Sequence, residues 1–283
     1  MGTQIPETPS PADDPLPEAM ALAQGAAAAG LGLKLLGGLA VRVICPAFPP
    51  RLRQGQDIDF ACLSKGRKDV AANLEKQGCE GDRRFNNLNG DRQMYFTAPS
   101  GRPIDVMVDR LTMCHTLDFR PSFGRLPLTV DAVDLLLSKL QIVELNEKDV
   151  RDTLQLLAGV PVSNSSAAAA AGGGAAAGGE AAASGRGAAG GGGSAYIDTE
   201  RFARLLGADW GWWRTVTGNL AKLPALAAER PALVPPDPPF DPVAQSAELL
   251  ELAQSAPKTV KWRLRANLGD RVRWYELPEE VGH

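Results

Sequence analysis

The 283-residue chain has few residues that could bind a structural zinc ion. Its only histidines are His115 and His283, and its four cysteines form no Cys-x-x-Cys pair. Structural zinc sites take their ligands from clusters of cysteine and histidine, so this pattern argues against such a site. We therefore expect the cysteines to be reduced and mostly buried, as in a reducing compartment.

The chain also lacks an excess of positive charge and an uninterrupted apolar run. Its net charge is −3, unlike that of a chain that binds nucleic acid over its whole surface. The alanine-rich stretch 19–41 contains Gln24, Lys34 and several glycines, so we do not expect it to cross a membrane. Residues 1–18 have no basic start before an apolar run, unlike an export signal. We expect a cytoplasmic protein without a membrane partner.

Two segments have compositions that cannot build a hydrophobic core. Residues 1–17 are rich in proline and acids, and residues 163–195 are almost entirely serine, alanine and glycine. We expect both to be disordered, the second as a flexible low-complexity insert. The rest of the chain is predicted to form an α/β core over residues 18–129 and a helical subdomain over residues 130–162 and 196–283.

Hydrophobic patterning predicts an α+β fold with a small mixed or antiparallel sheet, flanking helices and a C-terminal helical subdomain. Strand-like runs cover residues 31–36, 57–63, 94–98 and 104–108, and a Pro-Ser-Gly-Arg turn makes the last two a predicted hairpin. Polar residues 80–92 are expected to form a loop. The clearest helical spacing lies at residues 130–143 and 147–158, and the aspartates at 198 and 209 are expected helix caps.

Three aspartates stand in the strand-like runs. Asp57 and Asp59 are two residues apart, and side chains two apart on a strand share one face. Aspartate disfavours strands, so two in one strand favour a function over a solvated face. Asp105 lies in the second run, and Asp109, four residues on, is its competitor on the same face. Converging carboxylates suit Mg²⁺, which takes oxygen ligands and keeps positions open for substrate phosphates.

A glycine pair and two lysines complete the set of candidate residues. Gly37 and Gly38 follow a strand-like run, where a plain turn is the simpler interpretation, although glycine also lets a backbone approach a phosphate. Lys139 is either a solvated helix lysine or a phosphate ligand. Lys148 and Asp152 are four residues apart, which favours a surface ion pair.

The order of these segments resembles the nucleotidyltransferase superfamily, which has a polymerase-beta-like minimal fold. Its motifs are a Gly-Gly or Gly-Ser turn, an Asp-x-Asp strand and a third acid on a later strand. Residues 135–141 and 147–152, and Arg53 before the Asp-x-Asp, further resemble abortive-infection-type toxin nucleotidyltransferases. The resemblance covers roughly residues 30–157.

The resemblance implies an enzyme that moves a nucleoside monophosphate from an NTP to a hydroxyl of RNA, tRNA, a protein or a small molecule. It implies Mg²⁺ or Mn²⁺ as the cofactor. The implied catalytic and metal-binding residues are Asp57, Asp59 and Asp105. The implied nucleotide-binding residues are Gly37, Gly38, Arg53, Lys139 and Lys148.

Two alternatives stay open beside this activity. One is a catalytically degenerate fold that binds a protein or RNA, in which the three acids would not converge. The other is a toxin component of a toxin–antitoxin pair. The C-terminal run of lysines and arginines, with its tryptophans, could line a groove for nucleic acid, although a solvated helix face and interhelical packing are the simpler interpretations. The sequence does not indicate which NTP or acceptor is used, or the oligomeric state.

Overall fold

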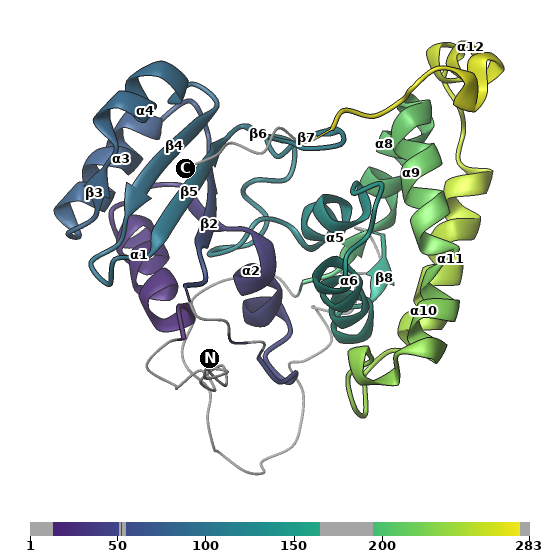
Figure 1. Cartoon of the computed structure of the whole chain (residues 1–283), viewed down its shortest axis with the longest axis horizontal. Helices are drawn as coiled ribbons and strands as arrows, with labels where there is room; N and C mark the ends of the chain where they lie inside the picture. The colour runs from purple at the N-terminus through teal and green to yellow at the C-terminus, as the bar shows by residue number, and fades with distance from the viewer. Residues whose placement is uncertain (1–13, 51, 53–54, 165–194, 278–283) are drawn as a thin grey trace, which may run out of the picture.

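An α/β part and a helical part lie beside each other in the computed structural model, which describes residues 14–50, 52, 55–164 and 195–277 (Figure 1). A small mixed sheet with flanking helices is followed by a largely helical C-terminal part, which confirms the predicted α+β class. Most of the two segments expected to be disordered lies outside the described residues.

A five-stranded mixed sheet organises the α/β part, with the strand order β1-β2-β5-β4-β3. β1 pairs with β2 in the antiparallel sense, β2 with β5 in the parallel sense, and β4 with both β5 and β3 in the antiparallel sense. The β4–β5 pair is the predicted hairpin. The strands are β1 (Leu33–Leu35), β2 (Ile58–Cys62), β3 (Glu80–Gly81), β4 (Gln93–Thr97) and β5 (Pro103–Val108).

The two faces of the sheet differ in burial because side chains alternate along each strand. Ile58, Phe60, Ile104 and Val106 are fully buried and belong to a core shared with α1 (Leu16–Ala28) and α3 (Arg67–Lys76). Most side chains on the opposite face, among them the acids of β2 and β5, are partly exposed, although Ala61 is buried there. The sheet therefore has one apolar, covered face and one polar face.

A short helix at the sheet edge corrects the prediction of a loop over residues 80–92. β3 and α4 (Arg83–Asn89) occupy most of this range. Asp82 caps α4 by accepting a hydrogen bond from the Phe85 amide, and Asn86 pairs with both backbone groups of Tyr95 where β3 ends. The helix has no buried residue, so its sequence lacks the apolar period from which helices are predicted.

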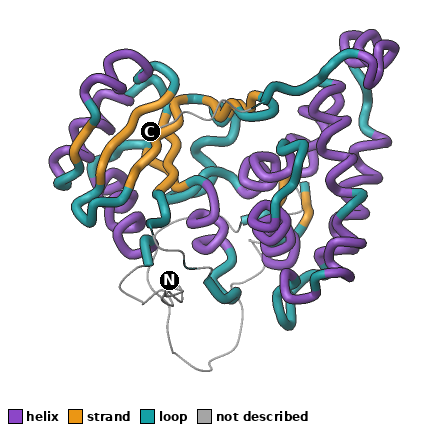
Figure 2. Tube along the Cα trace, viewed as in Figure 1, coloured by secondary structure: helices purple, strands orange, loops and turns teal. Residues whose placement is uncertain are grey.

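The helical part begins with α5 (Ala132–Leu140) and α6 (Glu147–Gly159), which confirm the two clearest predicted helices. Both contact α2 (Gly37–Ile44), which connects β1 to the loop before β2. All residues of α5 are buried, because it lies between the α/β part and the outer helices (Figures 1 and 2). The outer helices are α8 (Thr199–Ala208), α9 (Trp210–Leu220), α10 (Leu223–Glu229), α11 (Pro242–Ser255) and α12 (Val260–Leu268).

Two further sheets have two strands each. β6 (Arg110–Thr112) and β7 (Thr116–Asp118) form an antiparallel hairpin directly after β5. β8 (Val162–Ser163) and β9 (Ile197–Asp198) pair in the parallel sense. The described segments on either side of residues 165–194 therefore lie next to each other.

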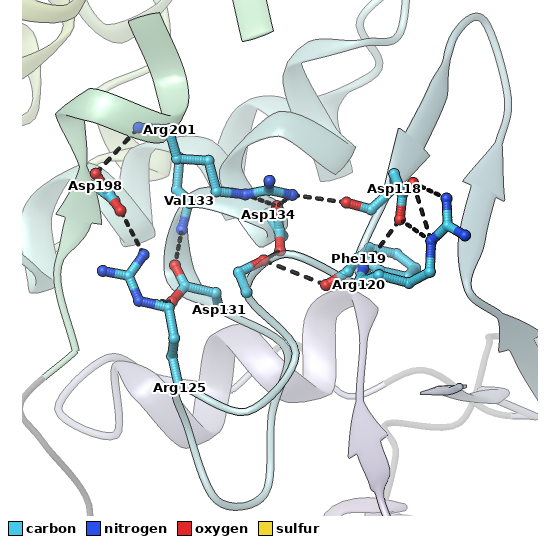
Figure 3. A network of polar contacts seen from close by, with 10 residues as sticks. Asp118, Phe119, Arg120, Arg125, Asp131, Val133, Asp134, Asp198 and Arg201 are labelled. Atoms are coloured by element: carbon cyan, nitrogen blue, oxygen red, sulfur yellow. Dashed lines mark hydrogen bonds and ion pairs between the residues drawn. The ribbon is translucent and has the colours of Figure 1, made fainter. Parts of the chain in front are cut away.

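A buried ionic network holds the hairpin against the helical part (Figure 3). The Arg201 guanidinium on α8 donates to Asp134 Oδ1 on α5 from Nε (2.8 Å) and Nη2 (2.5 Å), and also to the Asp118 carbonyl at the end of β7 (2.7 Å). Asp134 is 1% exposed and Arg201 6%. Beside them, Arg125 contacts Asp131 and Asp198. The network joins β7 to α5 and α8.

The cysteines and the apolar helices agree with the sequence analysis. All four cysteines are free and buried, as predicted. Among the helices in the described ranges, none combines the length and apolarity needed to cross a membrane.

Candidate active site

The start of α2 lies against the carboxylate of Asp59. The Leu36 amide donates to the Asp59 carbonyl at 2.9 Å, which brings the end of β1 beside β2. Gly37 then has φ +65°, a backbone region that favours glycine. A Cβ on Gly37 would lie 2.4 Å from Asp59 Oδ2. Glycine at position 37 therefore does more than allow the turn, because it also leaves space for the Asp59 carboxylate.

Asp59 and Asp105 are neighbours on adjacent strands. They are Cα partners in the parallel β2–β5 register, so both side chains stand on the polar face of the sheet. Tyr95 on β4 is the partner of Asp105 on its other side. Asp57 lies one residue before β2 begins, so the predicted strand from residue 57 starts at Ile58 instead.

Asp109 has a separate structural role. It lies just after β5 with φ +61°, and its Oδ1 accepts a hydrogen bond from the Ser64 amide at 2.9 Å. A short polar side chain that bonds backbone in this way is typical of turns. Asp105, rather than Asp109, is therefore the acid of β5 that stands beside Asp59.

The electrostatics of Asp59 show which charges surround it. Burial raises the pKa of its carboxyl to about 6, and the negative charges of Asp57 and Asp105 act in the same direction. Lys148 and Lys139 lower that pKa. Three acids and two lysines from distant parts of the sequence therefore share one electrostatic environment.

Lys139 is a buried, ion-paired lysine. It is 6% exposed, and its Nζ lies 2.7 Å from Asp152 Oδ2 and 3.6 Å from Asp149 Oδ1. The interpretation as a solvated helix lysine is wrong. A surface pair between Lys148 and Asp152 is also wrong, because Asp152 points inward to Lys139. Helical spacing suggested only the Lys148–Asp152 pair, whereas the packing of α5 on α6 puts Asp152 beside Lys139.

The same ion pair connects α6 to the glycine turn. A Cβ on Gly38 would lie 3.5 Å from Asp152 Oδ2, an ordinary contact distance. The α2 N-cap, Leu36, offers no side-chain hydrogen bond to the first turn of the helix. The first backbone amides of α2 therefore lie between Asp59 on one side and the Lys139–Asp152 pair on the other. Such amides, together with the helix dipole, favour an anion.

Gln93 is a site residue that the sequence analysis did not identify. Its Nε2 donates to Asp105 Oδ1 at 2.5 Å, from a position on β4 that shares the polar face. Asp149 and Asp152 were likewise not identified as partners of Lys139. The only sequence signal for Gln93 is its place in the alternating segment Gln93–Thr97. Arg53, predicted to bind the nucleotide, lies outside the described residues.

A metal site made of all three acids stays a prediction. Over residues 14–50, 52, 55–164 and 195–277, no three His, Cys, Asp or Glu side chains are arranged as a group that could hold a metal ion. The donor chemistry nevertheless suits Mg²⁺ or Mn²⁺, because carboxylate oxygens stand together on a partly exposed face and the charges of Asp57 and Asp105 raise the pKa of Asp59. Mg²⁺ commonly binds one or two carboxylates and completes its shell with water and substrate phosphates.

Comparisons with known proteins define no family for the chain. No protein-family model matches it, and no curated protein matches it. One similar solved structure is a crystal structure of ANT(2")-Ia in complex with adenylyl-2"-tobramycin. The two chains are 12% identical with a TM-score of 0.35, over 50% of this chain and 86% of the other. So weak a likeness assigns no role to any residue.

Proposed function

We propose that the chain is a metal-dependent nucleotidyltransferase that moves a nucleoside monophosphate from an NTP to a hydroxyl acceptor. One observation carries the proposal: Asp59 stands in register with Asp105 and against Gly37 at the start of α2. An acidic pair and an uncapped helix N-terminus are thereby brought to the same place. The first suits a cation and the second suits a phosphate.

The α2 end of the site would bind the triphosphate. Gly37 and Gly38 carry no Cβ, so phosphate oxygens can approach the first amides of the helix. Lys148 is half-buried and its charge acts on Asp59, which puts it in range to offset phosphate charge. Lys139 would act as a positioning residue, because it is held by Asp149 and Asp152 beneath the turn.

The acidic end of the site would hold the cofactor. Asp59 and Asp105, with Asp57 beside them, are the residues that would bind Mg²⁺ or Mn²⁺. When bound, the cation supplies positive charge that stabilises the attacking and leaving oxygens of phosphoryl transfer. Gln93 orients the Asp105 carboxylate through its hydrogen bond, and this carboxylate is the one that would help to activate the acceptor hydroxyl.

A catalytically degenerate fold that only binds a partner is the second candidate. Two observations favour it: Asp105 already accepts a hydrogen bond from Gln93, and Lys139 is already ion-paired. The toxin role stays a prediction from the sequence resemblance, and growth arrest on expression would test it.

Titration calorimetry with each NTP, with and without Mg²⁺, separates the two candidates. We expect one NTP to bind only when Mg²⁺ is present, and Asp59→Asn and Asp105→Asn to abolish this binding. Asp91→Asn, which removes an exposed carboxylate near β4, is the matched control and should bind like the wild type. If no NTP binds in a metal-dependent way, the proposal is wrong. The labelled NTP that binds is then incubated with Mg²⁺ and cell extract to find the acceptor.

A further inference from the structure

A cavity of about 500 Å³ lies away from the acidic site, where the β6–β7 hairpin meets the C-terminal end of the described chain. Its walls come from the hairpin, the start of α9, α12 and the segment after α12. The Glu276 amide donates to the Cys114 carbonyl at 3.0 Å, which ties that segment to the hairpin. Figure 1 shows the segment running from α12 back toward β7. The volume is that of a small-molecule site.

Aromatic rings form much of the cavity wall. Trp210, Trp262, Trp274 and Tyr275 all line it. Trp210 and Trp274 meet edge to face with centroids 5.8 Å apart. Trp262 and Trp274 are only half-buried, so packing between helices does not use their whole surface. Lys258 lies over the Trp262 ring and Arg214 over the Trp274 ring, and the remaining surface of these half-buried rings is suited to stacking with a planar ligand.

Positive charges stand among these rings. The Arg265 guanidinium lies 4.6 Å from the Trp210 ring centroid, and that of Arg273 lies 4.8 Å from the Tyr275 centroid. Lys261 is an exposed lining residue. In the described part of the chain, neither Lys261 nor Arg273 forms an ion pair with a carboxylate. Both are therefore available to an anionic ligand.

One residue that lines the cavity has an unsatisfied donor. Trp262 Nε1 is buried and has no hydrogen-bond partner among the described atoms. A buried N–H without an acceptor is costly, so native structures seldom keep one without a reason. This N–H has almost no accessible surface, so an acceptor on a ligand would reach it only after the Trp262 ring moves.

We propose that the cavity binds an unpaired nucleotide of single-stranded nucleic acid. A base would stack on Trp262 or Trp274, and the adjoining phosphates would contact Lys261 and Arg273. Residues 258–276 contain six lysines and arginines but only two acids, so positive charge continues along α12 beyond the cavity. This extended positive charge favours single-stranded nucleic acid over a free nucleotide as the ligand. The proposal does not depend on the acidic site being active.

Fluorescence anisotropy of a labelled eight-nucleotide single-stranded RNA, titrated with the full chain, tests this. Arg273→Ala is expected to weaken binding by about ten-fold and to reduce the salt slope by about one. Arg263→Ala removes the same charge from an exposed position on α12 that does not line the cavity. This matched control is expected to weaken binding by less than about three-fold. Tryptophan fluorescence should be quenched on binding, because four of the five tryptophans line the cavity.

Several results would overturn the proposal. One is an equal loss of RNA affinity for Arg273→Ala and Arg263→Ala, and another is an affinity for duplex RNA equal to that for single-stranded RNA. The proposal would also be wrong if tryptophan fluorescence were not quenched, or if a mononucleotide bound as tightly as the single-stranded RNA. Asp59→Asn separates this proposal from the nucleotidyltransferase one, because it should abolish NTP binding and leave RNA binding unchanged. Thermal melting of each variant shows that it is folded.

Discussion

Gly37 lies so close to Asp59 that residue 37 has no space for a side chain: a Cβ on Gly37 would lie 2.4 Å from Asp59 Oδ2. The positive φ of Gly37 and the nearby carboxylate demand glycine for separate reasons. Gly38, by contrast, has only an ordinary contact at 3.5 Å from Asp152 Oδ2. Two adjacent glycines therefore differ sharply in what they tolerate.

Gly37→Ala should destabilise the fold by about 1–3 kcal/mol, the usual cost of a non-glycine residue at a left-handed position. It should also displace the Asp59 carboxylate and weaken metal-dependent NTP binding. Gly38→Ala is the control, and its free energy of unfolding should change little. Urea denaturation and calorimetry measure both effects. Equal losses for the two variants would contradict the geometry of the turn.

Asp59→Asn should make the protein more stable at pH 8. The folded pKa of Asp59 is about 6, above its ordinary value of 3.8, so the folded state binds this proton more tightly than the unfolded state. The free energy of unfolding therefore falls as pH rises from about 4 to 6, and the asparagine variant lacks this loss. The pKa of Asp134 is also about 6, so this residue makes the stability fall with rising pH in the same way. Because its contribution is the same in both proteins, it cancels from their difference in stability.

Urea denaturation of both proteins at several pH values between 4 and 8 checks this prediction. The stability difference should be largest at pH 8 and should shrink toward pH 4. A difference that does not vary with pH would mean that the charge of Asp59 is not the cause. Added Mg²⁺ should stabilise the wild type at pH 8 and leave the variant unchanged.

Lys139→Met and Lys148→Met should separate a positioning role from a binding role. Removing Lys139 leaves Asp149 and Asp152 as buried acids without their cation, which should cost about 3–5 kcal/mol of unfolding free energy. Removing the half-buried Lys148 should change stability by less than about 1 kcal/mol but should weaken NTP binding. Chemical denaturation and calorimetry give the two numbers. A stable Lys139→Met protein would argue against the ion pairs.

Arg201→Met should destabilise the protein by about 3–5 kcal/mol, because Asp134 would stay buried without its cation. The double variant Arg201→Met/Asp134→Leu should recover most of that loss, since apolar residues can replace a buried ion pair. Arg120→Ala breaks the exposed pair with Asp118 and serves as the control with no measurable change. If the double variant were no more stable than the single one, the pair would not be the source of the loss.

The elements that the sequence predicted are those defined by local patterns. Asp198 and Asp209 cap α8 and α9 as expected, because a capping side chain bonds amides only two or three residues away. The β4–β5 hairpin follows from a turn between two short alternating runs. The sequence did not predict α4 because polar groups stabilise it: Asp82 caps its first turn, and Asn86 bonds it to β4. Neither interaction leaves a helical spacing of apolar residues in the sequence.

The candidate site was only partly predictable, for reasons of tertiary packing. The sequence indicated that Asp59 and Asp105 share a strand pattern, but not that they are register partners, because parallel pairing depends on a long crossover. The partner of Asp152 depends on how α5 and α6 cross, and helical spacing alone favoured Lys148. The cavity at α12 combines residues nearly 160 positions apart, such as Cys114 and Arg273.

The pairing of β8 with β9 makes the position between them suited to engineering. Val162 is the register partner of Ile197, and Ser163 that of Asp198, which Arg125 also holds. Both ends of the intervening stretch are thus anchored next to each other by the fold. Doubling the length of a chain between fixed ends costs only about 0.6 kcal/mol. A reporter domain whose own termini lie close together could therefore be grafted here, with its two ends held by the β8–β9 pairing.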